Sequence, residues 1–256
     1  MAKKSLLAER LDAIRERMAT AASRAKRDPA EVTLIAVTKT AGPETIREAV
    51  QLGVTDLAES RVQQLLQRAA QTQEMGQRRR VHGDDAKDTP AAPRWHMIGH
   101  LQRNKVKQIL PLIHCVHTID SLRLAEEIDV AAAKVDRRMA VMMQVNASEE
   151  SQKFGVAVGA ALHLGEQIAT MPNLQLVGLM TMAENSDDEK TIRNAFRRTR
   201  ELFEEMKWQK IGGTNFRHLS MGMSNDFEYA IEEGATLVRI GSALFGASTA
   251  DDVNDN

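Results

Sequence analysis

The clearest indication of fold class is the segment Val32-Thr33-Leu34-Ile35-Ala36-Val37-Thr38-Lys39. The run from Val32 to Val37 is short and almost continuously apolar, as is typical of a strand buried on both faces of a parallel sheet. A helical pattern follows from Pro43 to Leu52, with proline in the first turn and Gly53 just past the end. A strand followed by a helix is the repeating unit of parallel α/β folds.

The same unit recurs along the chain. We expect strands at Val32–Val37, Thr55–Glu59, Arg94–Gly99, Cys115–Ile119, Met139–Val145, Leu174–Met182, Phe216–Met221 and Leu237–Ile240. Further helical patterns lie near Val62–Gln71, Asn104–Leu110, Leu122–Lys134, Ala157–Thr170, Asp188–Lys207 and Asp226–Glu233. Eight units in 256 residues predict an α/β fold, a single-domain (β/α)8 barrel of the TIM type. An open doubly wound sheet is the alternative, but the turn after the first strand lacks its glycine-rich phosphate motif.

Three segments fall outside this alternation. Lys4 to Lys26 predicts an extra amphipathic helix, because apolar residues recur there at spacings of three and four. Thr72 to Pro93 is polar and ends in a proline-containing stretch, which predicts a long surface loop inserted into one domain spanning 1–256. The acidic residues 250–256 predict a short disordered tail.

Composition narrows the class of protein. A net charge of −1 and a pI near 6.7 provide no strong basic field for nucleic acid or an anionic membrane. Cys115 is the only cysteine, so no internal disulfide can form and a reducing compartment fits. The first residues contain no apolar core of a signal peptide, and no apolar run approaches the ~18 residues of a membrane span. The sequence therefore predicts a cytoplasmic protein.

The carboxyl ends of the strands are where a barrel of this type carries its functional residues. The polar or small residues expected there are Lys39, Glu59, His100, Asn104, Asp120, Asn146, Ser220, Ser224, Arg239, Gly241 and Ser242. Lys39 ends an apolar strand, so we expect its amine in a partly desolvated opening where the carboxyl ends of the strands meet. We call this opening the mouth of the barrel. Desolvation favours the neutral, nucleophilic form of a lysine amine. The alternative is that Lys39 only reaches to the barrel rim.

Two glycine-containing turns predict an anion site beside Lys39. They are Ser220-Met221-Gly222-Met223-Ser224-Asn225-Asp226 and Arg239-Ile240-Gly241-Ser242-Ala243, each leading into a helix. Backbone N–H groups in such turns bind phosphate, and barrel closure places the last strand next to the first. A lysine beside a phosphate site indicates a phosphorylated aldehyde as ligand. Arg239 either pairs with a carboxylate such as Glu59 or faces a ring nitrogen and keeps it unprotonated.

The histidines do not predict a metal site. His96 and His100 stand about 13 Å apart if the strand is extended, which is too far for one zinc ion. His114 and His117 flank Cys115, but no second cysteine or clear carboxylate accompanies them. Cys115 itself lies in an apolar run, which is typical of a buried, inert thiol.

Four motifs, in order, resemble the pyridoxal phosphate (PLP) homeostasis protein family, the single-domain relatives of the alanine racemase N-terminal barrel. They are Leu34-Ile35-Ala36-Val37-Thr38-Lys39-Thr40, the stretch from Trp95 to Lys105, the stretch from Leu219 to Asp226, and the stretch from Val238 to Gly246. The resemblance implies PLP held as a Schiff base on Lys39. It also implies phosphate contacts from Ser224, Gly241 and Ser242, and a pyridine-nitrogen contact from Arg239. Ser60 stands where the family has an asparagine near the cofactor.

Three functions remain open on the sequence. The resemblance implies a carrier that buffers PLP and delivers it to apo PLP-dependent enzymes. A racemase-like enzyme needs a second base opposite Lys39, and the only tyrosine, Tyr229, falls on a predicted helix. An aldolase needs an acid–base partner, for which Glu59 is the candidate. We favour the non-catalytic carrier, and we expect a monomer.

Overall fold

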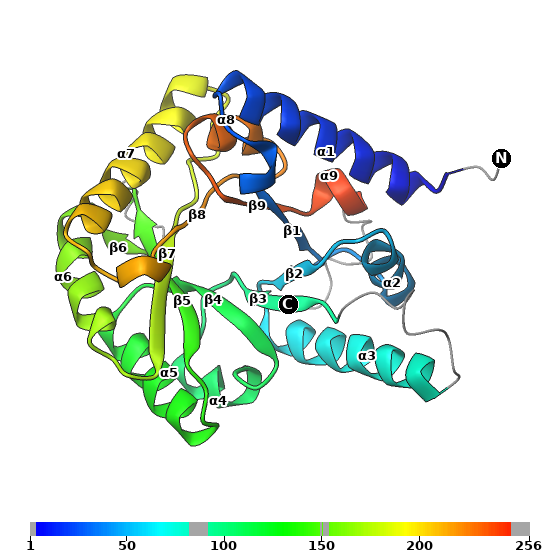
Figure 1. Cartoon of the computed structure of the whole chain (residues 1–256), viewed down its shortest axis with the longest axis horizontal. Coiled ribbons are helices and arrows are strands. Elements are labelled where there is room, and N and C mark those ends of the chain that lie inside the picture. The colour runs from blue at the N-terminus through cyan, green and yellow to red at the C-terminus, as the bar shows by residue number, and fades with distance from the viewer. Residues whose placement is uncertain (1–3, 82–91, 149, 151–153, 247–256) are drawn as a thin grey trace.

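Eight parallel strands form a closed barrel in the computed structural model, which describes residues 4–81, 92–148, 150 and 154–246 (Figure 1). They are β1 (Thr33–Val37), β2 (Asp56–Glu59), β3 (Arg94–Met97), β4 (Ile113–Ile119), β5 (Met139–Asn146), β7 (Leu174–Met180), β8 (His218–Ser220) and β9 (Leu237–Ile240). Strand β1 pairs with both β2 and β9, and β4 pairs with β5, so the ring is complete. The predicted barrel is confirmed. The two-residue strand β6 (Val156–Ala157) pairs with β5 beside the ring and is too short to show a periodicity.

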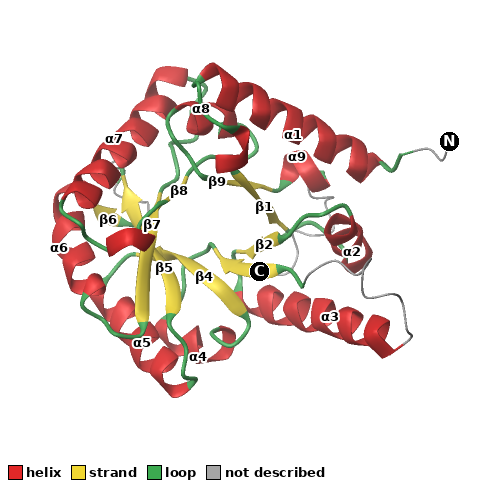
Figure 2. Cartoon of the chain, viewed as in Figure 1, coloured by secondary structure: helices red, strands yellow, loops and turns green. Residues whose placement is uncertain are grey.

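Helices surround the strands (Figure 2). They are α1 (Leu6–Arg24), α2 (Pro43–Gln51), α3 (Val62–Val81), α4 (Val106–Ile109), α5 (Leu122–Lys134), α6 (Val158–Ala169), α7 (Glu189–Trp208), α8 (Phe227–Glu232) and α9 (Ser242–Phe245). Short 3₁₀ turns occur at Pro29–Glu31, Arg103–Lys105 and Gly213–Asn215. None of the helices in the described part of the chain is long and apolar enough to cross a membrane.

Helix α1 is the predicted extra N-terminal helix. It begins at Ser5, whose side chain accepts a hydrogen bond from the backbone N–H of Ala8. Its apolar face packs against α8, α9 and α2. Leu11 and Ile14 are almost fully buried, and each such side chain contributes about 1.5–3 kcal/mol. The helix therefore closes the side of the barrel where the last elements meet the first.

Helix α3 corrects the predicted loop at 72–93. Residues 72–81 continue the helix, because this stretch is rich in good helix formers such as glutamine, arginine and methionine. Thr72 joins the helix, its hydroxyl donating to the carbonyls of Arg68 and Ala69 at 3.0 and 2.9 Å. The Trp95 indole N–H in turn donates to that hydroxyl at 3.3 Å. Residues 82–91 and the predicted tail at 250–256 lie outside the described residues.

Alternation along the strands separates two layers of core. The large apolar layer lies between strands and helices and includes Val238 and Ile240 of β9. A smaller cluster fills the barrel interior and includes Leu237 of the same strand. Successive strand residues face opposite sides of a sheet, so Arg239 faces the interior with Leu237. This alternation determines which polar residues can meet inside the barrel.

Candidate functional site

The end of β9 approaches the end of β1 closely at the barrel mouth. Gly241 is buried against β1, and a Cβ placed on it would lie 3.1 Å from the carbonyl oxygen of Val37. That spacing is tighter than most side chains tolerate, so the absence of a side chain lets the start of α9 approach the end of β1. Lys39 follows Val37 by two residues, so the structure brings the last turn and Lys39 to the same part of the mouth.

Lys39 itself is exposed in the turn after β1. Its backbone carbonyl accepts a hydrogen bond from Nη2 of Arg68 at 3.3 Å, which holds the turn in place. The side chain is more open to solvent than the sequence argument expected, so the prediction of a partly desolvated amine is wrong for this structure. The apolar strand stops two residues before Lys39, and Thr38 is the last buried residue.

Ser224, Gly241 and Ser242 gather around the start of α9, as the two turn motifs predicted. The hydroxyl of Ser224 accepts hydrogen bonds from the backbone N–H groups of Gly241 at 3.3 Å and Ala243 at 3.2 Å. Ser242 is exposed at the first position of the helix. These N–H groups therefore point toward an acceptor oxygen. The sequence did not indicate the Ala243 N–H, because a backbone donor leaves no mark on residue type.

The turn before Ser224 is fixed by Gly222 and Asp226. Gly222 adopts a φ of +88°, and a Cβ there would lie 2.6 Å from the Cβ of Ala230. The carboxylate of Asp226 accepts a hydrogen bond from the backbone N–H of Met223. Burial raises the pKa of Asp226, and that hydrogen bond works against the rise. The loop after β8 is thus held in a defined conformation, and Ser224 links it to the start of α9.

Arg239 is buried in the barrel interior and forms no hydrogen bond with a carboxylate of the described residues. Its Nη1 donates to the carbonyl and hydroxyl oxygens of Ser220, both at 2.7 Å, and its Nη2 donates to the carbonyl of Thr181 at 2.9 Å. Burial lowers the pKa of Arg239 to about 10, and the charge of Asp226 opposes this shift. The alternative that Arg239 pairs with Glu59 is wrong.

Glu59 faces the helix layer instead of the mouth. Its carboxylate pairs with Nη1 of Arg68 on α3 and accepts a hydrogen bond from the Thr38 hydroxyl. It lies one residue after Ala58 of the interior cluster, so strand alternation directs it outward. The second oxygen of this carboxylate is buried without a hydrogen-bond partner among the described residues. Glu59 therefore fastens α3 to the barrel, and its carboxylate is engaged by Arg68 and Thr38 instead of being available as an acid–base group.

Ser60 follows β2 and is half-buried. Its backbone packs directly on the end of β3, because a Cβ placed on Gly99 would lie 2.0 Å from the carbonyl oxygen of Ser60. No larger residue fits at Gly99 without moving this backbone. The contact fixes the position of Ser60 at the β2 side of the mouth.

The other predicted polar residues form a second group around the ends of β3, β4 and β5. His100 pairs with Asp120, with 3.3 Å between Nδ1 and Oδ2, and its ring stacks on Phe154 with centroids 4.3 Å apart. The side chain of Asn146 donates to the carbonyl of Glu150 at 2.8 Å. Asn104 lies in the turn before α4 and lines a separate surface hollow. These residues order the loops on their side of the barrel.

A cluster inside the barrel escaped the sequence reasoning. The side-chain donor atoms of His96, Cys115 and His117 all lie within 4.8 Å of one another, and all three residues are buried. Every ring nitrogen of the two histidines already has a hydrogen-bond partner, and burial raises the pKa of the Cys115 thiol. A metal would have to displace those bonds and deprotonate the thiol. Inward-facing positions on the neighbouring strands β3 and β4 were the signal that could have revealed the cluster.

Tyr229 packs between α7 and α8. The guanidinium of Arg193 lies 4.7 Å from the centre of its ring. It is the only tyrosine in the sequence. The chain therefore places no tyrosine opposite Lys39 as a second base.

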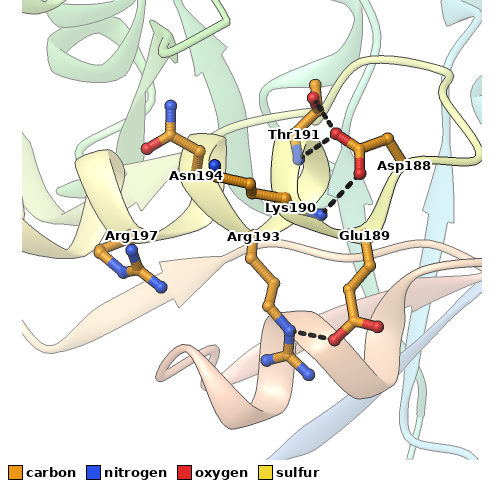
Figure 3. A pocket seen from close by; sticks show the side chains of 7 residues that line it. All are labelled: Asp188, Glu189, Lys190, Thr191, Arg193, Asn194 and Arg197. Atoms are coloured by element: carbon orange, nitrogen blue, oxygen red, sulfur yellow. Dashed lines mark hydrogen bonds and ion pairs between the residues drawn. The ribbon is translucent and has the colours of Figure 1, made fainter.

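A surface hollow of about 800 Å³ lies at the beginning of α7 (Figure 3). Asp188 caps the helix there by accepting from the backbone N–H groups of Lys190 and Thr191, and Arg193 pairs with Glu189 at 2.6 Å. The residues that line the hollow are Asp188, Glu189, Lys190, Thr191, Arg193, Asn194 and Arg197. These contacts account for the charged residues of the hollow as capping and ion-pairing groups on the solvent-facing start of α7.

The closed parallel barrel, the lysine after β1 and the backbone donors after β9 define a class of protein, the alanine racemase-type barrels. The chain belongs to the family described as alanine racemase, N-terminal domain, which matches residues 10–249. Within that class it is 38% identical over 238 residues to the pyridoxal phosphate homeostasis protein of Aquifex aeolicus, covering 93% of this chain and 96% of the relative. The family resemblance read from the four motifs is thus confirmed.

Two solved structures agree. An unknown protein from Bifidobacterium adolescentis superposes with a TM-score of 0.83 at 33% identity, covering 93% of this chain and 94% of that one. PipY of Synechococcus elongatus PCC7942, solved with PLP bound, gives a TM-score of 0.75 at 29% identity and covers 94% and 100%.

Proposed function

We propose that this chain binds pyridoxal 5′-phosphate as a Schiff base on Lys39 and serves PLP homeostasis, buffering the cofactor and delivering it to apo-enzymes. The observation that supports the proposal is that the backbone N–H groups of Gly241 and Ala243 both donate to one acceptor, the hydroxyl oxygen of Ser224, near the end of β1. A phosphate group accepts hydrogen bonds from such a set of donors.

The other residues suit the same ligand. Ser224 and Ser242 supply hydroxyls around the phosphate position, and Ser60 lies on the β2 side of the mouth. Arg239 offers N–H donors from the interior, where a pyridine nitrogen would accept one and stay unprotonated. PLP supplies an aldehyde for the lysine amine and a ring that withdraws electrons; an unprotonated ring withdraws them less strongly. That arrangement suits storage of the cofactor more than demanding chemistry on a substrate.

The relatives support this reading through their names, since the one from Aquifex aeolicus is called a pyridoxal phosphate homeostasis protein and PipY was solved with PLP. Tyr229 packs against Arg193, and the carboxylate of Glu59 is engaged by Arg68 and Thr38, so the racemase-like and aldolase alternatives lack an available second group. Location in the cytoplasm, a monomeric state and delivery to PLP-dependent apo-enzymes are further parts of the proposal.

A spectroscopic titration tests the proposal. Adding PLP to the purified protein is expected to produce a visible absorbance band that borohydride removes. Lys39→Ala is expected to abolish the band and leave the melting temperature within about 2 °C, because the side chain is exposed. Lys134→Ala is the matched control, since Lys134 is an exposed lysine at the end of α5. A borohydride-reducible band that persists in Lys39→Ala would refute the assignment.

A further inference from the structure

A continuous chain of hydrogen-bonded side chains crosses the barrel interior. The carboxylate of Asp56 lies 2.9 Å from Nε2 of His96, and Nδ1 of His96 lies 2.9 Å from Nε2 of His117. Nδ1 of His117 lies 2.9 Å from the hydroxyl of Ser220, which accepts from Arg239 at 2.7 Å. The five residues come from five different strands, and none is more than 3% exposed.

This chain of hydrogen bonds joins the two ends of the barrel. Asp56 is the first residue of β2, and Arg94, the first residue of β3, binds its carboxylate through two hydrogen bonds of 2.8 and 2.7 Å. The Arg94 side chain is 51% exposed, so this end meets solvent. Ser220 is the last residue of β8, at the edge of the mouth. The interior is therefore bridged by an ordered polar path instead of being filled by apolar side chains alone.

The positions of the protons follow from the two ends. Burial works to raise the pKa of Asp56, but hydrogen bonds from His96, Arg94 and Thr55 outweigh it and hold that pKa well below its usual range, so the carboxylate can only accept. His96 must then donate through Nε2. At the other end Ser220 accepts from Arg239, which leaves its own O–H free to donate to Nδ1 of His117. Neutral His117 then donates through Nε2 to Nδ1 of His96.

If the hydrogen bonds ran in the opposite direction, from His96 to His117 to Ser220, the interior would have to hold one more buried positive charge. If His96 carried two protons, its Nδ1 would donate to His117, and His117 would donate to a Ser220 oxygen already bonded to Arg239. The charged and titratable groups that surround the two rings are Asp56, Arg94, His114, Cys115, His218 and Arg239. Asp56 is the only carboxylate among them, and Arg94 already pairs with it; burial raises the pKa of the Cys115 thiol, which favours its neutral form. Burial keeps the pKa of His117 well below its usual value, which also favours the neutral ring.

We propose that Asp56, His96, His117 and Ser220 are positioning residues that hold Arg239 as a hydrogen-bond donor toward the ring nitrogen of the bound ligand. The proposal rests on the proposed PLP function. Arg239 has five N–H groups. Two on Nη1 go to Ser220 and one on Nη2 to Thr181. The Nε–H and the second Nη2–H make no hydrogen bond within the described residues, so these two donors remain for a ligand.

The direction of the chain can be measured in the free protein. Nitrogen-15 NMR of the histidine rings at pH 7 is expected to show His96 and His117 as neutral Nε2–H tautomers. A doubly protonated ring, or an Nδ1–H tautomer at either position, would overturn the proposed direction. This measurement needs no PLP, so it separates a failure of the chain from a failure of the proposed function.

The role toward the ligand is tested by three variants. His117→Phe removes both links, whereas His117→Gln keeps one donor and one acceptor. His114→Phe is the control, because the ring centres of His114 and His96 lie 5.5 Å apart and no hydrogen bond joins the two rings. The readouts are the dissociation constant for PLP and the pH dependence of the visible band.

We expect His117→Phe to weaken PLP binding about tenfold and to shift the pH profile of the band, with partial rescue in His117→Gln and no change in His114→Phe. Equal affinity and an unchanged pH profile in a folded His117→Phe would overturn the proposal, as would failure of His117→Gln to rescue. If the wild type takes up no PLP, the proposed function fails and the role toward a ring nitrogen fails with it, while the NMR result still decides the direction of the chain.

Discussion

The mouth and the interior of this barrel differ in solvent exposure and in the kind of hydrogen bonds that they contain. The mouth presents Lys39 and Ser242, both exposed, and backbone N–H groups that converge on the hydroxyl of Ser224. The interior presents buried side chains that are linked by hydrogen bonds from strand to strand, from Asp56 to Arg239. An exposed amine is accessible for reversible covalent attachment, and a buried network is rigid. On the proposed function, this fold would separate the anchor for the ligand, Lys39, from the groups that orient it.

Removing one hydroxyl from each region should give the largest contrast. Ser220→Ala deletes a buried group that bonds both Arg239 and His117, so the free energy of unfolding should fall by about 2–4 kcal/mol. Ser242→Ala removes an exposed hydroxyl and should change it by no more than about 0.5 kcal/mol. Urea denaturation of both variants measures the difference. Equal losses would show that the interior network adds no stability beyond that of the rim.

Replacing Arg239 tests whether orientation and attachment are separate. Arg239→Met keeps much of the side-chain volume but removes every donor, so PLP affinity should fall about 10- to 100-fold. The borohydride-reducible band should still form at high PLP, because the proposed anchor, Lys39, is unchanged. Absorbance titration and reduction of the same sample provide both readouts. Unchanged affinity would make Arg239 a purely structural residue.

The sequence predicted the mouth far better than the interior, for a physical reason. Lys39, Ser224 and Gly241 sit in motifs that are contiguous in the chain, and barrel closure brings those motifs together. The chain from Asp56 to Arg239 takes one residue from each of five strands, and only the inward alternation and the register between strands bring them into contact.

Other errors have local causes. The exposure of Lys39 and the outward direction of Glu59 each depend on where a strand ends, to within one residue. The helix at 72–81 was missed because a polar composition was interpreted as a loop, although its residue types favour helix.

As the pH falls, the barrel interior should lose stability before the mouth does. Burial, followed by the charge of Arg217, lowers the pKa of His218 to about 4, below the unfolded value of about 6.5. The unfolded chain then binds more protons between these pH values, so stability present above pH 6.5 is lost as the pH falls toward 4. His218 alone should account for about 1 kcal/mol between pH 7 and pH 5.5.

The matching variant is His218→Gln. Its free energy of unfolding, measured in urea at several pH values, should depend less on pH than that of the wild type. A slope equal to that of the wild type would mean that His218 titrates alike in the folded and unfolded states.

The smallest effect is expected at the phosphate position. Ser242→Ala should weaken PLP binding about threefold, because an exposed hydroxyl contributes less than the less exposed backbone donors of Gly241 and Ala243 beside it. Equilibrium titration measures the change. A loss as large as that in Arg239→Met would mean that the rim, and not the interior, dominates recognition.

The most direct test is to find the covalent bond. The protein is incubated with PLP, reduced with borohydride, digested, and mapped by mass spectrometry. We predict the reduced cofactor on the peptide that contains Lys39, with no equivalent modification in Lys39→Ala. Reduced cofactor on another lysine, or on none, would contradict the proposal that the turn after β1 anchors PLP.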